Sequence, residues 1–188
     1  METVLELTDR TDEALAAEAA REGSDGPAFV ALLDRYRDRV WRICFRLMGH
    51  ADDAQDAAQE VFVRLFLNRA KFDGRSKYST WVHGVAVRTC LTLRRGRTRR
   101  RRHEQTAGET VLETKAGEKH AAAPGLSLDL ERMLETLDEE DRALVILKYA
   151  ENYSYEELAE IFGLSESACK MRVSRAREKI QKKFGDSA

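Results

Sequence analysis

A polar loop followed by an increasingly basic helix is the stretch of this sequence with the clearest chemistry. The loop, 71–78, carries aromatic residues beside a glycine, and seven of the ten residues from Arg94 to His103 are arginine. Aromatic rings can stack on bases that have left a duplex, while guanidinium groups bind phosphates. The stretch therefore indicates binding of partly unstacked nucleic acid. Taken alone, it also fits core aromatics followed by a solvated arginine tail.

A second pattern, near the C-terminal end, is a short helix, a glycine turn and a basic helix. Ser154 and Glu157 have the spacing of a capping box, while Gly163 and Ser165 suit the end of one helix and the cap of the next. In the last helix the inward positions are Cys169, Val173, Ala176 and Ile180, and the opposite face holds Lys170, Met171, Ser174 and Arg175, flanked by Arg172 and Arg177. This is the helix-turn-helix pattern, whose second helix enters the major groove. A plain helical hairpin with a basic surface is the alternative.

A third candidate surface lies on a helix predicted over 53–67. Asp56, Glu60, Val63 and Leu67 follow the 4-3-4 spacing of one helix face, apart from the alanine-rich and apolar stripe that the core needs. A face of mixed carboxylates and apolar side chains suits docking to a basic partner helix. An ordinary solvated face is the alternative from this feature alone.

The composition limits the classes of protein to which the chain can belong. It has 188 residues, of which 43% are hydrophobic and 35% charged, with only two prolines and a formal net charge of −1. The three cysteines lie far apart and read as small buried hydrophobes in a reducing compartment, and no Cys/His cluster predicts a metal site or a cofactor. No apolar run is long enough for a membrane span and no signal sequence opens the chain, so we expect a cytoplasmic protein without membrane insertion.

The periodicities predict an all-α fold of two small helical domains joined by a flexible linker, the second a helix-turn-helix domain. The predicted parts are an N-terminal tail with a short helix at 1–26, a helical domain at 27–103, a linker at 104–127 and a second domain at 128–188.

Local signals predict several helix ends. Pro27 and Gly49 bound one helix, Asp52 caps the next, and a hydroxyl at Ser79 or Thr80 caps a helix running to about Arg102. On that last helix the residues expected to face outward are His83, Val87, Arg88, Thr92, Arg94 and Arg95.

Together these pieces resemble a bacterial RNA polymerase sigma factor of the extracytoplasmic-function (ECF) class. The stretches that carry the resemblance are Phe29–Gly49, Asp52–Arg64, Lys71–Gly74 with Ser79–Val82, and Glu157–Glu160 with Lys170–Arg177. Each stretch is weakly specific, whereas the ordered set is highly specific and covers most of the chain outside the linker.

The resemblance implies two helical domains that lie on RNA polymerase core enzyme, with no catalytic activity. The implied polymerase-binding residues are Asp53, Asp56, Gln59, Glu60, Val63, Arg64 and Leu67. Those implied for melting and reading the minus-ten promoter element, with one base flipped into a pocket, are Phe72, Lys77, Tyr78, Trp81, His83, Arg88, Arg94 and Arg95. Those implied for the minus-thirty-five element are Ser167, Lys170, Met171, Arg172, Ser174, Arg175 and Arg177, of which Arg172 and Arg177 suit phosphates. The resemblance also implies an anti-sigma factor as partner and a regulon that answers stress or envelope signals.

The chain departs from the family pattern at several DNA-reading positions. Arg88 stands where the family often has Asn, Thr92 where it has Asp, and Met171 where it has Ser. These changes affect which promoter is read rather than the family. The alternatives are a stand-alone helix-turn-helix regulator, which leaves 52–102 unexplained, a helical adaptor, and an enzyme, for which no catalytic motif is present.

Overall fold

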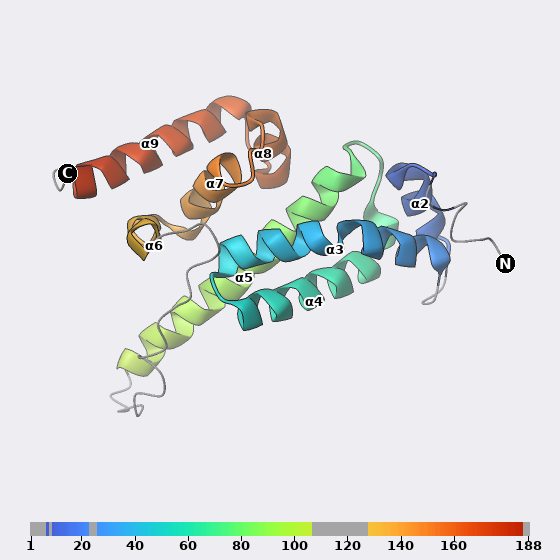
Figure 1. Cartoon of the computed structure of the whole chain (residues 1–188), viewed down its shortest axis with the longest axis horizontal. Coiled ribbons are helices and arrows are strands. Elements are labelled where there is room, and N and C mark those ends of the chain that lie inside the picture. Colours follow the sequence, from blue (N-terminus) through green and yellow to red (C-terminus); the bar gives the residue numbers. More distant parts are fainter. Residues whose placement is uncertain (1–6, 8, 23–25, 107–127, 186–188) are drawn as a thin grey trace.

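The computed structural model describes residues 7, 9–22, 26–106 and 128–185, and within these ranges the chain is helical with no strand. The helices are α2 (Asp12–Ala19), α3 (Pro27–Met48), α4 (Ala51–Leu67), the 3-10 turn η1 (Arg69–Lys71), α5 (Tyr78–Thr106), α6 (Leu128–Leu134), α7 (Glu139–Tyr149), α8 (Tyr155–Phe162) and α9 (Glu166–Phe184). Figure 1 shows α6–α9 gathered along one side of the bundle made by α2–α5. The predicted all-α fold is confirmed.

Helix α3 is the centre of the N-terminal bundle. Its buried side chains recur every three or four residues, and α2, α4 and α5 all pack against it. Pro27 occupies the first turn and Gly49 ends the helix in the left-handed region at φ 83°, as predicted. All three cysteines are buried and free, and the sulfurs of Cys44 on α3 and Cys90 on α5 lie 3.7 Å apart.

Two predicted helix starts are wrong. Helix α4 begins at Ala51 with His50 at its cap position, so Asp52 lies inside the first turn, where it still complements the helix dipole. Helix α5 begins at Tyr78, so Ser79 and Thr80 lie inside its first turn rather than at its cap. The Tyr78 backbone N–H donates to the Glu13 carboxylate of α2 at 3.1 Å, so a group distant in sequence satisfies a free N–H of the first turn.

The C-terminal helices follow their local signals closely. Ser154 and Glu157 form the capping box, and Gly163 ends α8 in the left-handed region at φ 67°. Ser165 caps α9 by accepting a hydrogen bond from the Ala168 N–H. The inward faces of α7, α8 and α9 then share one core, which fixes the angle of the last helix.

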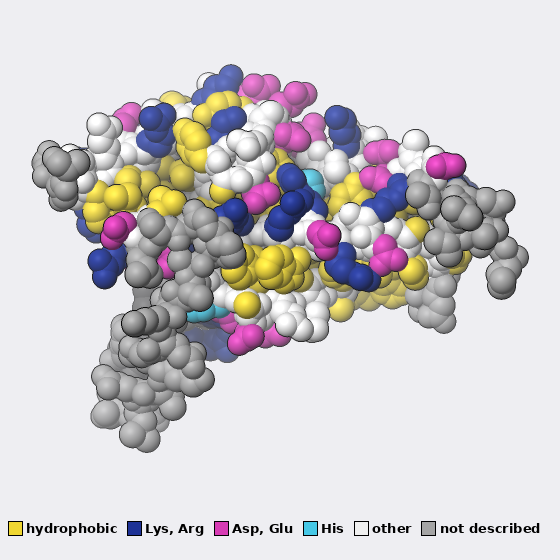
Figure 2. All heavy atoms as spheres, viewed as in Figure 1, with side chains coloured by type: hydrophobic (Ala, Val, Ile, Leu, Met, Phe, Trp, Pro, Cys, Tyr) yellow, Lys and Arg dark blue, Asp and Glu magenta, His cyan; other side chains and the backbone are white. Residues whose placement is uncertain are grey.

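The two helical groups pack against each other. Helix α5 contacts both α7 and α8, and α3 contacts α7. On the face seen in Figure 2, basic and acidic side chains stand beside one another across the middle of the molecule. Residues 104–106 of the predicted linker continue α5, and 107–127 lie outside the described residues.

This packing overturns part of the predicted outward face of α5. His83 and Val87 are buried, at 9% and 1% exposed, because α5 is covered from a second side by the C-terminal helices. Tyr78, one of the residues implied for the minus-ten element, is also buried, with its ring 5.7 Å from that of Tyr36.

The capping box yields a stability prediction. Replacing Ser154 with Ala leaves the Glu157 N–H of α8 without its acceptor, and we expect a loss of about 1 kcal/mol in the free energy of unfolding. Urea denaturation followed by circular dichroism measures it. The matched control, Ser167→Ala, changes an exposed serine inside α9 and should leave stability unchanged or slightly raised, since alanine is the better helix former. Equal effects of the two changes would contradict the role given to the cap.

Candidate polymerase and nucleic-acid interfaces

The exposed face of α4 combines acids with uncovered apolar side chains. Val63 is 52% and Leu67 68% exposed, and Asp56 and Gln59 lie on the same open side. Glu60 is half-buried and accepts a hydrogen bond from Arg64 at 2.7 Å. Large apolar side chains with this exposure beside carboxylates fit a protein partner that brings both apolar area and positive charge.

Asp53 has a different environment from the other α4 acids. Its carboxylate forms a two-pronged ion pair with Arg97 of α5, and this hydrogen-bonded pair raises the pKa of Arg97. The pair ties the start of α4 to the basic half of α5. Asp53 therefore has an internal partner in addition to its predicted role toward polymerase.

Three aromatic rings gather where the loop meets α5. The ring centroid of Phe72 lies 5.1 Å from that of Tyr78 and 5.8 Å from that of Trp81, and Tyr78 and Trp81 are 5.5 Å apart. Burial raises the pKa of Tyr78, which stays a neutral packing group. Lys77 is exposed beside it, and the Trp81 ring is half-buried at the surface.

A shallow pocket opens beside Trp81 between α4, η1 and α5. Its lining residues are Arg64, Asn68, Lys71, Trp81, Val85, Arg88 and Thr89. Three of the seven side chains are cationic and none is acidic. An indole wall with cations around it can take an unstacked base while holding the phosphates on either side.

Sequence reasoning missed Asn68, Lys71 and Thr89 as members of this pocket. The signal was present in the spacing: 64, 68 and 71 share one face of α4 and its extension, and 81, 85, 88 and 89 share one face of α5. It was missed because each face also fits an ordinary surface, and only the crossing of the two helices brings them together.

Helix α9 presents the predicted reading face to solvent. Lys170, Ser174, Arg175 and Arg177 are exposed, and Met171 is 52% exposed. Ser167 lies at the exposed start of the same helix. The contacts of this face lie at its surface: Ser174 donates to Glu178 at 3.1 Å, and the Lys170 and Arg177 cations lie 5.6 Å and 5.9 Å from the rings of Tyr155 and Tyr149. These exposed cations can therefore turn toward a duplex without breaking the domain core.

Several other predicted DNA-contact residues are engaged inside the protein. Arg94 and Arg95 of α5 form ion pairs with Glu139 and Glu140 of α7. Arg172 of α9 donates to Asp141 at 2.6 Å. Two further residues contact the C-terminal helices directly. The Arg88 guanidinium donates to the Ile161 carbonyl at 3.2 Å, and His83 Nδ1 lies 2.7 Å from the Tyr153 hydroxyl.

In the part of the chain that the structure describes, no three Asp, Glu, Cys or His side chains group as metal ligands. Among the described helices, none has the length and apolar content to cross a bilayer.

Comparison with known proteins places this chain in a family. Sigma-70 region 2 matches residues 32–100 and Sigma-70 region 4 matches residues 127–180. The ECF RNA polymerase sigma factor SigW of Bacillus subtilis is 30% identical over 173 residues, covering 86% of this chain and 91% of that protein. The ECF RNA polymerase sigma-E factor of Haemophilus influenzae is 30% identical over 183 residues, covering 93% of this chain and 95% of that protein.

Solved structures agree on the fold. CnrH in complex with the cytosolic domain of CnrY aligns with a TM-score of 0.63 at 23% identity, covering 94% of this chain and 99% of that one. RpoE from Bartonella quintana, in complex with the anti-sigma factor NepR, aligns at 0.59 and 23% identity, covering 85% and 98%. The chain belongs to the ECF family of RNA polymerase sigma factors. These are transcription initiation factors and not enzymes.

The buried His83 gives a pH prediction. Burial, with a smaller contribution from Arg39, lowers its pKa to about 4. Between about pH 6.5 and 4 the unfolded chain binds a proton that the folded chain does not, so stability falls as pH falls, by about 2 kcal/mol at pH 5. We expect His83→Gln to remove this part of the pH dependence. Urea unfolding of both proteins at pH 7 and pH 5 measures it, and equal losses in the two proteins would contradict the buried, neutral histidine.

Proposed function

We propose that this sigma factor directs core RNA polymerase to promoters through three separate surfaces. The α4 face binds polymerase, the pocket beside Trp81 takes one flipped base of the minus-ten element, and α9 reads the minus-thirty-five element in the major groove. The observation that carries the proposal is the cationic pocket around Trp81, which has no acidic lining residue and lies near the N-terminal end of the arginine-rich helix α5. A regulator that binds only duplex DNA has no use for such a pocket.

The free energies of duplex opening and base stacking limit how much of the melting this protein can drive without polymerase. Opening a duplex costs about 1.4 kcal/mol per base step, and stacking one freed base on an aromatic ring returns about 1–3 kcal/mol. One pocket therefore offsets only the first steps of melting. The chain can nucleate an open region, but a larger partner has to hold the separated strands. Weak promoter binding by the protein alone, and strong binding with core enzyme, follow from this.

The proposed setting is the cytoplasm, with an anti-sigma factor as the regulating partner. Of two proteins with the same fold, RpoE was solved with the anti-sigma factor NepR and CnrH with the cytosolic domain of CnrY. The exposed apolar residues Val63 and Leu67 offer this chain a surface that either polymerase or an inhibitor could cover.

Permanganate footprinting tests the proposed function, since it modifies unpaired thymines. On promoters selected from a random library, we expect reactive thymines near the start site only when protein, core enzyme and DNA are all present. Protection of duplex DNA by the protein alone, with no reactive thymines when core is added, would support a stand-alone regulator instead.

The α4 face gives a binding prediction. The double change Asp56→Lys with Glu60→Lys places positive charge against a basic partner, and we expect affinity for core enzyme to fall about tenfold or more. The matched control is Glu156→Lys with Glu160→Lys, which has the same spacing and charge change on exposed positions of α8. Pull-down with purified core measures both. Unchanged binding by a folded Asp56/Glu60 variant would contradict this face.

The exposed face of α9 gives two predictions about DNA binding, one for base preference and one for salt dependence. Replacing Arg175 with Ala removes a predicted base contact, so we expect about 1–3 kcal/mol weaker holoenzyme binding and relaxed preference at one base pair. Replacing Arg177 with Ala removes a phosphate contact, so binding should weaken evenly across sequences and the salt slope should fall by about one. Promoter binding at several salt concentrations, on matched and mismatched minus-thirty-five elements, separates the two. Identical behaviour of the two variants would contradict the assignment.

A further inference from the structure

Four consecutive acids open α7, and their contacts reach well beyond that helix. The side chain of Asp138 caps α7, as expected at a helix start. The three that follow reach other helices. Glu139 pairs with Arg94 and Glu140 pairs with Arg95, both on α5, while Asp141 accepts from Arg172 of α9. We call residues 138–141 the acidic turn.

Glu140 joins two helices that are proposed to read different promoter elements. Its Oε1 accepts from Arg95 of α5, and its Oε2 accepts from Arg172 of α9 at 3.0 Å. The hydrogen bonds from Arg172 and Arg95 together lower the pKa of Glu140. One carboxylate thus neutralises part of both predicted DNA-binding surfaces.

A buried contact fixes the acidic turn in place. The turn between α7 and α8 inserts Tyr153, 2% exposed, against α5, where its hydroxyl meets His83. The neighbouring Glu151 lies 3.6 Å from Arg46 and 4.0 Å from Arg39 of α3. The ion pairs of the acidic turn are partly exposed to solvent, so by themselves they hold the surfaces together weakly. The buried Tyr153 supplies apolar contact area, and the ion pairs fix the alignment of the helices.

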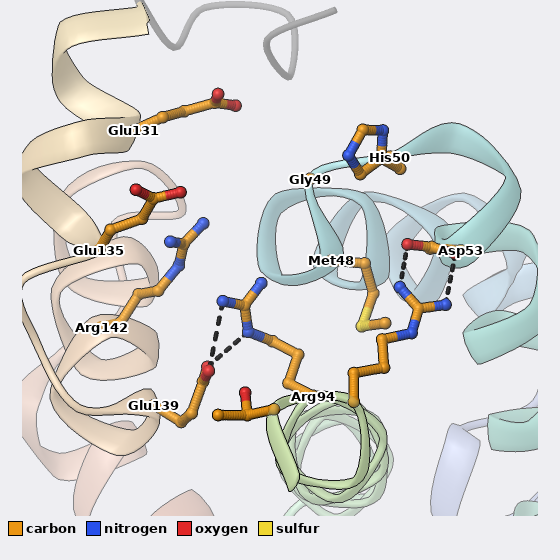
Figure 3. Close-up of a pocket in the computed structure, with 11 residues that line it drawn as sticks. Met48, Gly49, His50, Asp53, Arg94, Glu131, Glu135, Glu139 and Arg142 are labelled. Carbon is orange, nitrogen blue, oxygen red and sulfur yellow. Dashed lines mark hydrogen bonds and ion pairs between the residues drawn. The ribbon is translucent and has the colours of Figure 1, made fainter. Parts of the chain in front are cut away.

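The other end of this contact is a polar cleft. Figure 3 shows Arg94 of α5 reaching across it to Glu139, with Glu135 and Arg142 on the same wall as Glu139 and Asp53 on the opposite wall. Side chains in an open polar cleft can exchange partners without exposing apolar surface. The ion pairs of the acidic turn are therefore the separable part of the contact.

The contact cannot persist on a promoter. Elements named for positions ten and thirty-five lie about 25 base pairs apart, which is more than two helical turns, or about 85 Å along the duplex. Helices α5 and α9, joined here through a single Glu140 side chain, cannot reach both at once. The acidic turn must release its arginines before both elements are read.

We propose that the acidic turn is an internal phosphate mimic that holds the free protein closed and shields its promoter-reading arginines. Carboxylates and phosphates present the same paired acceptors to a guanidinium group, so polymerase-bound promoter DNA replaces Glu139 and Glu140 on Arg94, Arg95 and Arg172. This rests on the proposed roles of these arginines in DNA binding.

Removing the two carboxylates tests the proposal. The variant Glu139→Gln with Glu140→Gln keeps side-chain size and removes both charges. Energy transfer between dyes on Gln55→Cys of α4 and Lys179→Cys of α9 reports the separation of the two helical groups, since the native cysteines are buried. We expect lower transfer in the variant than in the parent protein. Tyr153→Ala, which removes the buried contact, should lower it further.

Binding of a random-sequence single-stranded 20-mer, without polymerase, is measured on the same proteins. We expect about threefold to twentyfold tighter binding for the double variant, from the loss of the two carboxylates that compete with DNA for the arginines. Glu156→Gln with Glu160→Gln makes the same change in net charge at exposed α8 positions that have no ion pair among the described residues, and it should give a smaller gain.

Unchanged energy transfer in both the double variant and Tyr153→Ala would overturn the closed state. An equal gain in DNA binding from the α8 control would overturn the phosphate mimicry, because net charge alone would then explain it. Lower energy transfer in the double variant without tighter DNA binding would contradict the proposed DNA role of the α5 arginines. The ion pairs would then close the protein without mimicking phosphate.

Discussion

The arginine side chains of α5 and α9 remain charged at any physiological pH, so each needs an anion or water in every state of the protein. In the described structure carboxylates from α7 provide anions for Arg94, Arg95 and Arg172, and Glu140 serves both helices at once. This constraint links stability to function. The groups suited to hold promoter phosphates are the same groups that hold the two helical parts of the molecule together.

Helix α5 carries several functions because each of its sides meets a different surface. One side enters the core with α3 and α4, a second forms the wall of the cationic pocket through Trp81 and Arg88, and a third receives the turn that contains Tyr153. Arg88 belongs to both the pocket and the interdomain contact. This one side chain therefore connects the cationic pocket to the packing of α5 on α8.

Local signals made much of the fold predictable from the sequence. The capping box at Ser154, the left-handed glycines and the apolar stripe of α9 depend on residues within a few positions of each other, and the structure has them as expected. Contacts distant in sequence were not predictable. His83 looked exposed because one buried stripe on α5 satisfies its own domain, and nothing in its periodicity reveals a second cover. The Glu13 contact to the start of α5 and the pocket across α4 and α5 depend likewise on how helices cross.

Run-off transcription with purified core RNA polymerase and a library of random promoter fragments tests the central claim most directly. The account predicts transcripts from a subset of templates that share two sequence elements at a fixed spacing, and none from core enzyme alone. A protein that binds core enzyme yet starts transcription from no template in the library would contradict it.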